Sequence, residues 1–281
     1  EAGKKCLMCS RCSEDCPVDI DLMSIRRISR DKGDLDTDGN YQYLQKVKAF
    51  NAIGRVAYFG GCMSQLTPNI GTAMERIFDS VGQRYWFMDK DKSICCGRPL
   101  VQQGFNKQAA ELRRKNTELI HSSGATALVT SCPICYNAFK NEYQLHIPVY
   151  HHTEYLNHLI ESGKLKVSKG NLKVTYHDPC ELGRGCGIYE EPRKVLNAVA
   201  TLLETQNDKE KSLCCGMSLG NTVITLEQQT AIRNSALDNL TAPKPDVVVT
   251  ACPMCKRAFQ HGGTSAQVQD IAEVVAAARQ A

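Results

Sequence analysis

Short apolar runs alternate with amphipathic stretches along this chain. RVAYFGGC (55–62) predicts a buried strand that leads into a glycine turn. Apolar residues then recur at helical spacing over 70–81, and Gly82 is the expected end of that helix. RYWFMD (84–89) predicts a second strand, in which Trp86 is expected to lie in the core. The pattern is therefore strand, helix, strand.

The same pattern continues and then returns. A helix is predicted over 108–120 and a strand over 127–132. Farther on, KVTYHDPC (173–180) and DVVVTAC (246–252) predict strands. Between them we expect a helix that starts near Pro192 and places these apolar residues on one face: Val195, Leu196, Val199, Leu202 and Leu203. Strands that alternate with helices predict an α/β fold with a largely parallel sheet in each unit.

Cysteines repeat with the same period. VTSCPICYNAF (129–139) and VTACPMCKRAF (249–259) are identical at 7 of 11 positions and lie 120 residues apart. Upstream of each segment, the chain carries a single cysteine and then Cys-Cys-Gly at closely similar spacings. Each copy reads C…CCG…CPxC, and the ten cysteines are Cys62, Cys95, Cys96, Cys132 and Cys135, then Cys180, Cys214, Cys215, Cys252 and Cys255. The chain therefore contains two copies of one unit.

Each of these cysteine groups follows a predicted strand. Sites in parallel sheets form outside the carboxyl ends of the strands, so three segments should converge at one edge of each sheet. Five thiolates exceed the four that a zinc ion or an ordinary cubane cluster takes. Adjacent cysteines suit a cluster with several irons, and the glycine that follows lets the backbone approach it closely. A structural zinc site for each CPxC pair and a vicinal thiol pair for each CCG are the alternatives.

The beginning of the chain carries a separate motif. KCLMCSRCSEDCPVDI (5–20) has the ferredoxin spacing C-x2-C-x2-C-x3-C-P, formed by Cys6, Cys9, Cys12 and Cys16. In two-cluster ferredoxins the fourth cysteine ligates the other cluster, and only one copy of the run is present. The simplest account is a further copy upstream of Glu1; a single cluster held by all four cysteines is the alternative. The polar run over 29–40 predicts a solvated connection.

Composition narrows the class of protein. The chain has 281 residues, 42% hydrophobic and 23% charged, which is enough for two compact domains. Its fifteen cysteines lie in tight clusters, which favours metal binding in a reducing, cytoplasmic setting over a disulfide framework. No apolar run is long enough to span a membrane. The net charge of +4 includes no basic run, so we expect no nucleic-acid partner.

Several side chains near the motifs admit two interpretations. His177 and Asp178 could tune a cluster or carry protons, or they could shape the end of their strand. Of His151 and His152, one is expected to start a helix or line the site, since neighbouring side chains point apart in a strand.

Three more residues lie near the motifs. Cys186 could be a sixth thiol near the second group, but a free cysteine is favoured. Arg98 and Arg184 could bind an anionic substrate, and solvated arginines are at least as well supported.

The doubled C…CCG…CPxC unit behind a ferredoxin run resembles the cysteine-rich CCG-domain family, over residues 5–20 and about 55–260. That family includes the catalytic subunit of heterodisulfide reductase, thiol:fumarate reductase, and the iron–sulfur subunits of glycolate oxidase and anaerobic glycerol-3-phosphate dehydrogenase. The resemblance implies two tandem, pseudo-symmetric Rossmann-like units after a mainly helical ferredoxin-type segment. We expect the divisions 1–50, 51–165 and 166–281.

The resemblance also implies the cofactors. In the heterodisulfide reductase branch, each complete five-cysteine unit holds a noncubane [4Fe-4S] cluster. Carried over, the first set (Cys62 to Cys135) and the second set (Cys180 to Cys255) would each hold one. One or two cubane [4Fe-4S] clusters, depending on the upstream segment, would feed electrons to that site.

Two functions follow as hypotheses. In the first, the paired units reduce or form a disulfide or a related thiol substrate, because a disulfide takes two electrons. In the second, the chain relays electrons from a flavin-dependent hydroxy acid or glycerol-3-phosphate dehydrogenase to a quinone or another carrier. No nucleotide-binding motif is present, so electrons must come from another polypeptide. We therefore expect a hetero-oligomer with a flavoprotein or other electron donor, in the cytoplasm, with membrane association through a partner left open.

Overall fold

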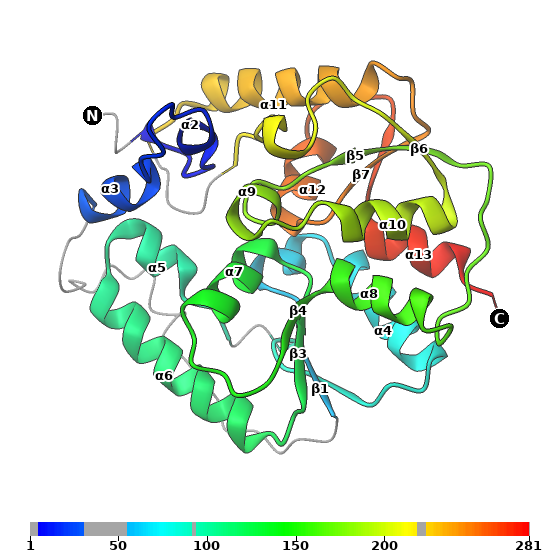
Figure 1. The fold of residues 1–281 in the computed structure, drawn as a ribbon, viewed down its shortest axis with the longest axis horizontal. Coiled ribbons are helices and arrows are strands. Elements are labelled where there is room, and N and C mark those ends of the chain that lie inside the picture. The colour runs from blue at the N-terminus through cyan, green and yellow to red at the C-terminus, as the bar shows by residue number, and fades with distance from the viewer. Residues whose placement is uncertain (1–4, 31–54, 92–93, 218–222, 281) are drawn as a thin grey trace.

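The computed structural model describes residues 5–30, 55–91, 94–217 and 223–280. Its strands form two four-stranded sheets, ordered β2-β1-β3-β4 and β6-β5-β7-β8, and every strand pair in them is parallel (Figure 1). The α/β prediction with two similar units is confirmed. The expected connection over 29–40 falls largely outside the described residues.

The first unit contains one sheet and its flanking helices. Its strands are β1 (Val56–Phe59), β2 (Tyr85–Phe87), β3 (Ala127–Thr130) and β4 (Val149–His151). Its helices are η2 (Cys62–Leu66), a short 3-10 helix, and α4 (Asn69–Ser80), α5 (Arg98–Gln103), α6 (Asn106–Ser122), α7 (Pro133–Asn141) and α8 (His152–Glu161).

The second unit repeats this order. Its strands are β5 (Lys173–His177), β6 (Thr201–Leu203), β7 (Val247–Thr250) and β8 (Gln267–Asp270). Its helices are α9 (Gly183–Cys186), α10 (Glu190–Val199), η3 (Lys209–Lys211), α11 (Leu226–Thr241), α12 (Pro253–Gln260) and α13 (Ile271–Ala278). Before both units lie α2 (Arg11–Glu14) and α3 (Leu22–Ile28).

The two units share a core. Helix α4 packs on α13 and α8 packs on α10, so these four helices lie between the two sheets (Figure 1). Phe78, Leu156, Leu196 and Val275 from the four helices are fully buried in one apolar cluster. Burying each such side chain contributes roughly 1.5–3 kcal/mol. Apolar packing therefore fixes how the units face each other.

Most predicted elements are present, and one prediction is wrong. Trp86 is buried in β2 as expected. The helix expected to carry Leu202 and Leu203 ends at Val199, and these leucines lie in β6. Ala200 takes an extended conformation, and the next residues pair with β5 instead of continuing the helix. A strand of three residues leaves too short a pattern to distinguish from a helix face.

The outer elements complete the description. The edge strands β4 and β8 were not predicted; each leads directly into the helix that packs at the unit interface, α8 or α13. Within the residues that the structure describes, no helix is both long and apolar enough to cross a bilayer.

Candidate metal centre

The cysteines of each unit lie past the carboxyl ends of the central strands. Cys62 follows β1 and Cys180 follows β5, while Cys132 and Cys252 follow β3 and β7. The latter two cysteines are the N-caps of α7 and α12, and a proline stands at the first helical position of each. Proline suits that position because its missing N–H would have no partner there.

In the first unit, five sulfurs form a continuous line of contacts. Cys95 lies in hydrogen-bonding contact with Cys62 and Cys96. Cys96 contacts Cys135, which contacts Cys132. Hydrogen bonds from Cys135 and Cys95 hold the pKa of Cys96 well below its usual value. Cys96 therefore lies at the middle of the line, with one cysteine contact on each side.

The second unit repeats this line. Cys214 contacts Cys180 and Cys215, and Cys215 contacts Cys255, which contacts Cys252. The Sγ atoms of Cys255 and Cys215 lie 3.2 Å apart. Hydrogen bonds from Cys214 and Cys255 hold the pKa of Cys215 well below its usual value. The second cysteine of each CCG therefore has the same electrostatic role.

A glycine keeps the first line of sulfurs open. The backbone of Gly61 has a φ angle of 89°, which residues other than glycine rarely adopt. A Cβ atom there would lie 2.8 Å from the Cβ of Cys132 and 3.3 Å from the Sγ of Cys135. The backbone at Gly61 therefore lies so close to Cys132 and Cys135 that a side chain at this position would clash with them. This approach and the line of five thiols fit an iron–sulfur cluster better than separate structural pairs.

The sulfur lines are not arranged around a point. Within the described ranges, no three or more histidine, cysteine, aspartate or glutamate side chains converge as ligands of a metal ion. Each thiol instead contacts the next one along its line. A polynuclear cluster can take such ligands, because its irons are spread over several positions.

The two sulfur lines are neighbours. Cysteines of both lines belong to one buried cluster, which includes Cys96, Cys132, Cys215 and Cys252. A hydrogen bond from Cys135 lowers the pKa of Cys132, but burial and the nearby charge of Cys252 raise it, and the net shift is upward. Helix α12 of the second unit also packs on η2 of the first. The repeat therefore brings its two cysteine sets together across the unit interface.

Arg98 joins the units beside the cysteines. It follows the first CCG, is 2% exposed, and forms ion pairs with Glu142 and Glu181. Glu181 follows Cys180 and accepts a 2.7 Å hydrogen bond from Asn137. Of the two interpretations of Arg98, the solvated arginine is wrong, because the side chain is buried and paired with two carboxylates.

His177 and Asp178 hold loops in place. His177 Nε2 lies 3.0 Å from the Leu213 carbonyl, and burial lowers the pKa of His177. Asp178 receives two hydrogen bonds from Arg193, at 2.7 and 2.8 Å. The hydroxyl of Ser212 also donates to the Asp178 carbonyl. Of the two interpretations, these contacts support shaping of the strand end.

His151 and His152 have separate roles. His151 is the N-cap of α8, which confirms the expectation that one of the pair starts a helix. His152 Nε2 lies 3.0 Å from Asp270 Oδ1, across the unit interface. Both histidines are fully buried, and burial lowers the pKa of His151 well below its usual value.

Cys186 lies apart from the motif, as favoured. It is half-buried among Glu181, Lys140 and Arg98, and burial raises its pKa to about 12.

Asp89 is a residue that the sequence analysis missed. Its carboxylate is 1% exposed and accepts the N–H groups of Gly60 and Gly61 at 2.8 and 2.7 Å. Burial raises its pKa to about 7. It follows a short strand without any motif, so only the fold shows that it shapes the turn before Cys62.

The N-terminal motif lies against the second unit. Cys6 is buried, while Cys9, Cys12 and Cys16 are partly exposed. Cys9 is in hydrogen-bonding contact with Cys214, and this contact lowers the pKa of Cys9 to about 5. The ferredoxin run and the second sulfur line therefore touch.

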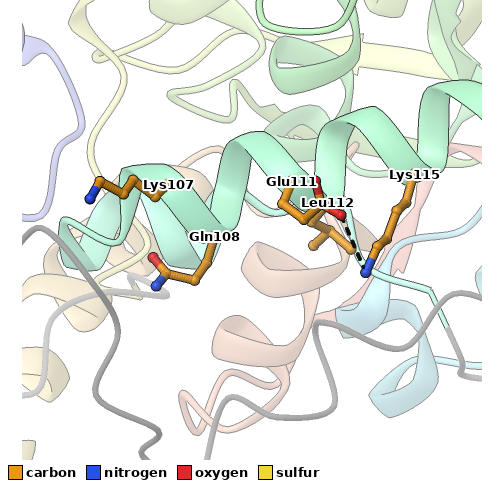
Figure 2. A pocket seen from close by; sticks show the side chains of 5 residues that line it. All are labelled: Lys107, Gln108, Glu111, Leu112 and Lys115. Carbon is orange, nitrogen blue, oxygen red and sulfur yellow. Dashed lines mark ion pairs between the residues drawn. The ribbon is translucent and has the colours of Figure 1, made fainter.

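Two surface pockets lie away from the sulfurs. One, of about 220 Å³, runs along α6 and is lined by Lys107, Gln108, Glu111, Leu112 and Lys115 (Figure 2). Figure 2 also shows the ion pair of Glu111 with Lys115, at 3.5 Å. The other, of about 570 Å³, lies between α10 and the loop after β6. None of the predicted ligands lines either pocket.

The model of the cysteine-rich domain, CCG, matches residues 56–140 and 174–260. The chain belongs to the CCG cysteine-rich domain family, with two copies of the domain, and the predicted resemblance is confirmed.

Several curated relatives are named as oxidoreductases or as subunits of them. The chain is 33% identical to one subunit of the dihydromethanophenazine:CoB–CoM heterodisulfide reductase of Methanosarcina acetivorans, over 79% of this chain and 58% of that one. It is 28% identical to the EtfAB:quinone oxidoreductase of Syntrophomonas wolfei, over 96% of this chain and 45% of that one. It is 26% identical to one subunit of the CoM/CoB fumarate reductase of Methanothermobacter marburgensis, over 89% of this chain and 55% of that one. The chain spans about half the length of these relatives.

A solved structure shares the fold. A hypothetical protein from Helicobacter pylori aligns with a TM-score of 0.54 at 9% identity, over 92% of this chain and 58% of that one. This likeness supports the doubled α/β architecture alone.

Proposed function

We propose that the chain is a heterodisulfide reductase-like subunit in which the two cysteine lines hold two noncubane [4Fe-4S] clusters. The ligands would be Cys62, Cys95, Cys96, Cys132 and Cys135 in one unit, and Cys180, Cys214, Cys215, Cys252 and Cys255 in the other. The observation that carries this proposal is the matching line of five cysteines in each unit, in which each side chain is in hydrogen-bonding contact with the next. The proposed division is 1–50, 51–165 and 166–281.

The pairing of the units supports two-electron chemistry. Reduction of a disulfide breaks one S–S bond, consumes two electrons and two protons, and yields two thiols. Two clusters, when bound, would supply one electron each. The adjacency of Cys132 and Cys252 supports two sources that lie side by side. The substrate proposed is therefore a small disulfide, or the thiol pair that forms one.

The protein surroundings suit this role. The cysteines at the centre, such as Cys96 and Cys215, are almost fully buried, so water is largely excluded from the sulfurs. Arg98 with its two glutamates and Asp89 with its two N–H donors hold the flanking backbone. A fixed, dry environment is what tunes the potential of an iron–sulfur site.

Electrons would enter from another polypeptide through the N-terminal motif. Cys6, Cys9, Cys12 and Cys16 would hold one cubane cluster, or take part in two together with a further cysteine run. Two of the relatives are named as subunits of oxidoreductases, which supports a hetero-oligomer with a flavoprotein or other electron donor. We propose a cytoplasmic location, with any membrane association made through that partner.

A relay function is the second candidate. The EtfAB:quinone oxidoreductase aligns with 96% of this chain. By analogy with that relative, the chain would pass electrons from a flavoprotein to a quinone or another carrier, and its paired units would bind no thiol.

Spectroscopy separates these candidates. The chain would be purified without oxygen, and iron-edge and EPR spectra would be recorded with and without an added small thiol. A cluster signal that changes with thiol supports disulfide chemistry, whereas an indifferent signal supports the relay. Colourless protein with one zinc per CPxC pair would contradict both.

A further inference from the structure

One arginine fastens the N-terminal segment to the second unit. Arg184 lies on α9, and its guanidinium donates three hydrogen bonds to backbone carbonyls. Nε reaches the Cys9 carbonyl at 2.8 Å, and Nη1 reaches those of Glu210 and Ser212 at 2.9 and 3.0 Å. Hydrogen bonds from a charged donor are among the stronger ones in proteins. A single planar side chain thus joins the ferredoxin run to the loop that leads into Cys214.

The repeat shows that this contact is specific to one unit. Arg184 stands four positions after Cys180, and Leu66 stands four positions after Cys62. Leu66 is 52% exposed and has no polar group to donate. The first unit therefore lacks the side chain that performs this docking in the second.

The docked segment places a sulfur of the ferredoxin run on a sulfur of the second line. Cys9 lies in hydrogen-bonding contact with Cys214, and the charge of Arg184 also acts on Cys9. Electron transfer falls steeply with distance, so a sulfur-to-sulfur contact defines a short route.

The segment also touches the first unit, through its own arginine. Arg30 donates to the Cys6 carbonyl at 2.9 Å and to the Gln102 carbonyl at 3.4 Å. The longer of these bonds is the one that reaches the first unit. The bond from Arg184 to the Cys9 carbonyl, at 2.8 Å, is the shorter of the two.

We propose that Arg184 is a positioning residue that fixes the entry point of electrons, so that they pass from the site of Cys9 to the second unit through Cys214 and only then to the first unit. This inference rests on the proposed function. Each transfer moves one electron, supplied by the electron-donor subunit, and no bond or proton changes place. The first unit then receives its electron through the contact between the two sulfur lines.

Two variants and a control test this role on the whole chain. Arg184→Ala removes all three bonds, and Arg184→Lys keeps the charge but cannot reach three carbonyls in one plane. Arg114→Ala is the control, because Arg114 is exposed on α6 and pairs with Glu111 and Glu118 of its own helix.

The first readout is hydrogen exchange on the chain as purified without oxygen. With Arg184→Ala, amide exchange over 5–20 should rise about tenfold or more, which corresponds to about 1.4 kcal/mol. Arg184→Lys should lie between this and the wild type, and Arg114→Ala should match the wild type. Unchanged exchange in Arg184→Ala would overturn the docking role.

The second readout is magnetic. In the reduced, iron-loaded chain, EPR should show spin–spin splitting between the N-terminal cluster and that of the second unit, and Arg184→Ala should lose it. Splitting that survives Arg184→Ala, or that disappears with Cys96→Ser and not with Cys215→Ser, overturns the proposed route. A wild-type chain that binds no iron refutes the proposed function and the route with it, whereas raised exchange in Arg184→Ala would still establish the docking.

Discussion

The guanidinium of Arg98 lies 3.3 Å from both carboxylate oxygens of Glu181, and this ion pair joins the two units beside their cysteines. Arg98 follows the CCG of the first unit, and Glu181 follows the first cysteine of the second. Both side chains are buried. The relative placement of the cysteine sets thus depends on a buried charge pair as well as on apolar packing.

Removing Arg98 should destabilise the chain. Arg98→Met leaves Glu181 buried without its cation, and breaking one partner of a buried pair costs about 3–5 kcal/mol. Urea unfolding measures the loss of stability when the m-value, the slope of the unfolding free energy against urea concentration, is the same in the compared proteins. Arg114→Met is the control, since its surface pairs lie in solvent. Equal midpoints for the two variants would contradict this account.

Adding a methyl group at residue 61 should prevent the first unit from binding iron. In Gly61→Ala the added Cβ meets Cys132 at 2.8 Å and Cys135 at 3.3 Å. In Gly82→Ala, at φ of 62°, the added Cβ meets nothing within 4 Å, so only the backbone cost of about 1–2 kcal/mol applies. Iron analysis should show the loss of one cluster in the first variant and none in the second. Full iron in both would mean that Gly61 does not face a cluster.

The two units differ in one tyrosine contact. Tyr58 in β1 pairs with Val129, and its hydroxyl lies 2.8 Å from Ser131 Oγ. Tyr176 holds the matching position in β5, but Ala251 stands where the first unit has the serine. Among the residues that the structure describes, the Tyr176 hydroxyl has no hydrogen-bond partner.

This difference gives a reciprocal prediction. Ser131→Ala should lower the free energy of unfolding by about 1–3 kcal/mol, because it leaves a buried hydroxyl unpaired. Ala251→Ser should raise it by about 0.5–1.5 kcal/mol, because it supplies the missing partner. Thermal unfolding of both variants checks this. Opposite signs are expected, and a loss in both would show that the units are not equivalent here.

The buried carboxyl of Asp89 should make stability depend on pH. Burial raises its pKa from 3.8 to about 7, so between these values the folded chain holds a proton that the unfolded chain has released. Stability from this group is therefore full below the unfolded pKa and falls as the pH rises to about 7. Urea midpoints measured from about pH 5 to about pH 7.5 should fall less with rising pH in Asp89→Asn than in the wild type, because this group no longer titrates. The exposed control Asp79→Asn should show the same pH dependence as the wild type. An identical slope in all three proteins would contradict the assignment.

Sequence alone predicts much of this architecture, for a local reason. The strands before Cys62, Cys132, Cys180 and Cys252 are apolar runs bounded by turn residues, and the cysteine motifs follow them directly. Spacing and period therefore suffice to place the sulfurs at the sheet edges.

What sequence could not give is contact between distant segments. Arg98 appears as an ordinary charged residue until Glu181, 83 positions away, is found beside it. Arg184 likewise gives no indication that it reaches Cys9, 175 positions earlier. Leu202 and Leu203 fit a helix in the sequence because three strand residues carry no period of their own. Each of these features depends on contact with a segment that is distant in the sequence.

The most direct test of the central claim is iron and sulfide analysis of the anaerobically purified chain and three cysteine variants. Cys96→Ser and Cys215→Ser remove the central cysteine of each line, and Cys186→Ser removes a thiol outside the motif. The first two variants should each lose one cluster of iron and sulfide in equal proportion, while Cys186→Ser should retain the wild-type content. Iron that is unaffected by Cys96→Ser and Cys215→Ser, or zinc without sulfide in the wild type, would contradict it.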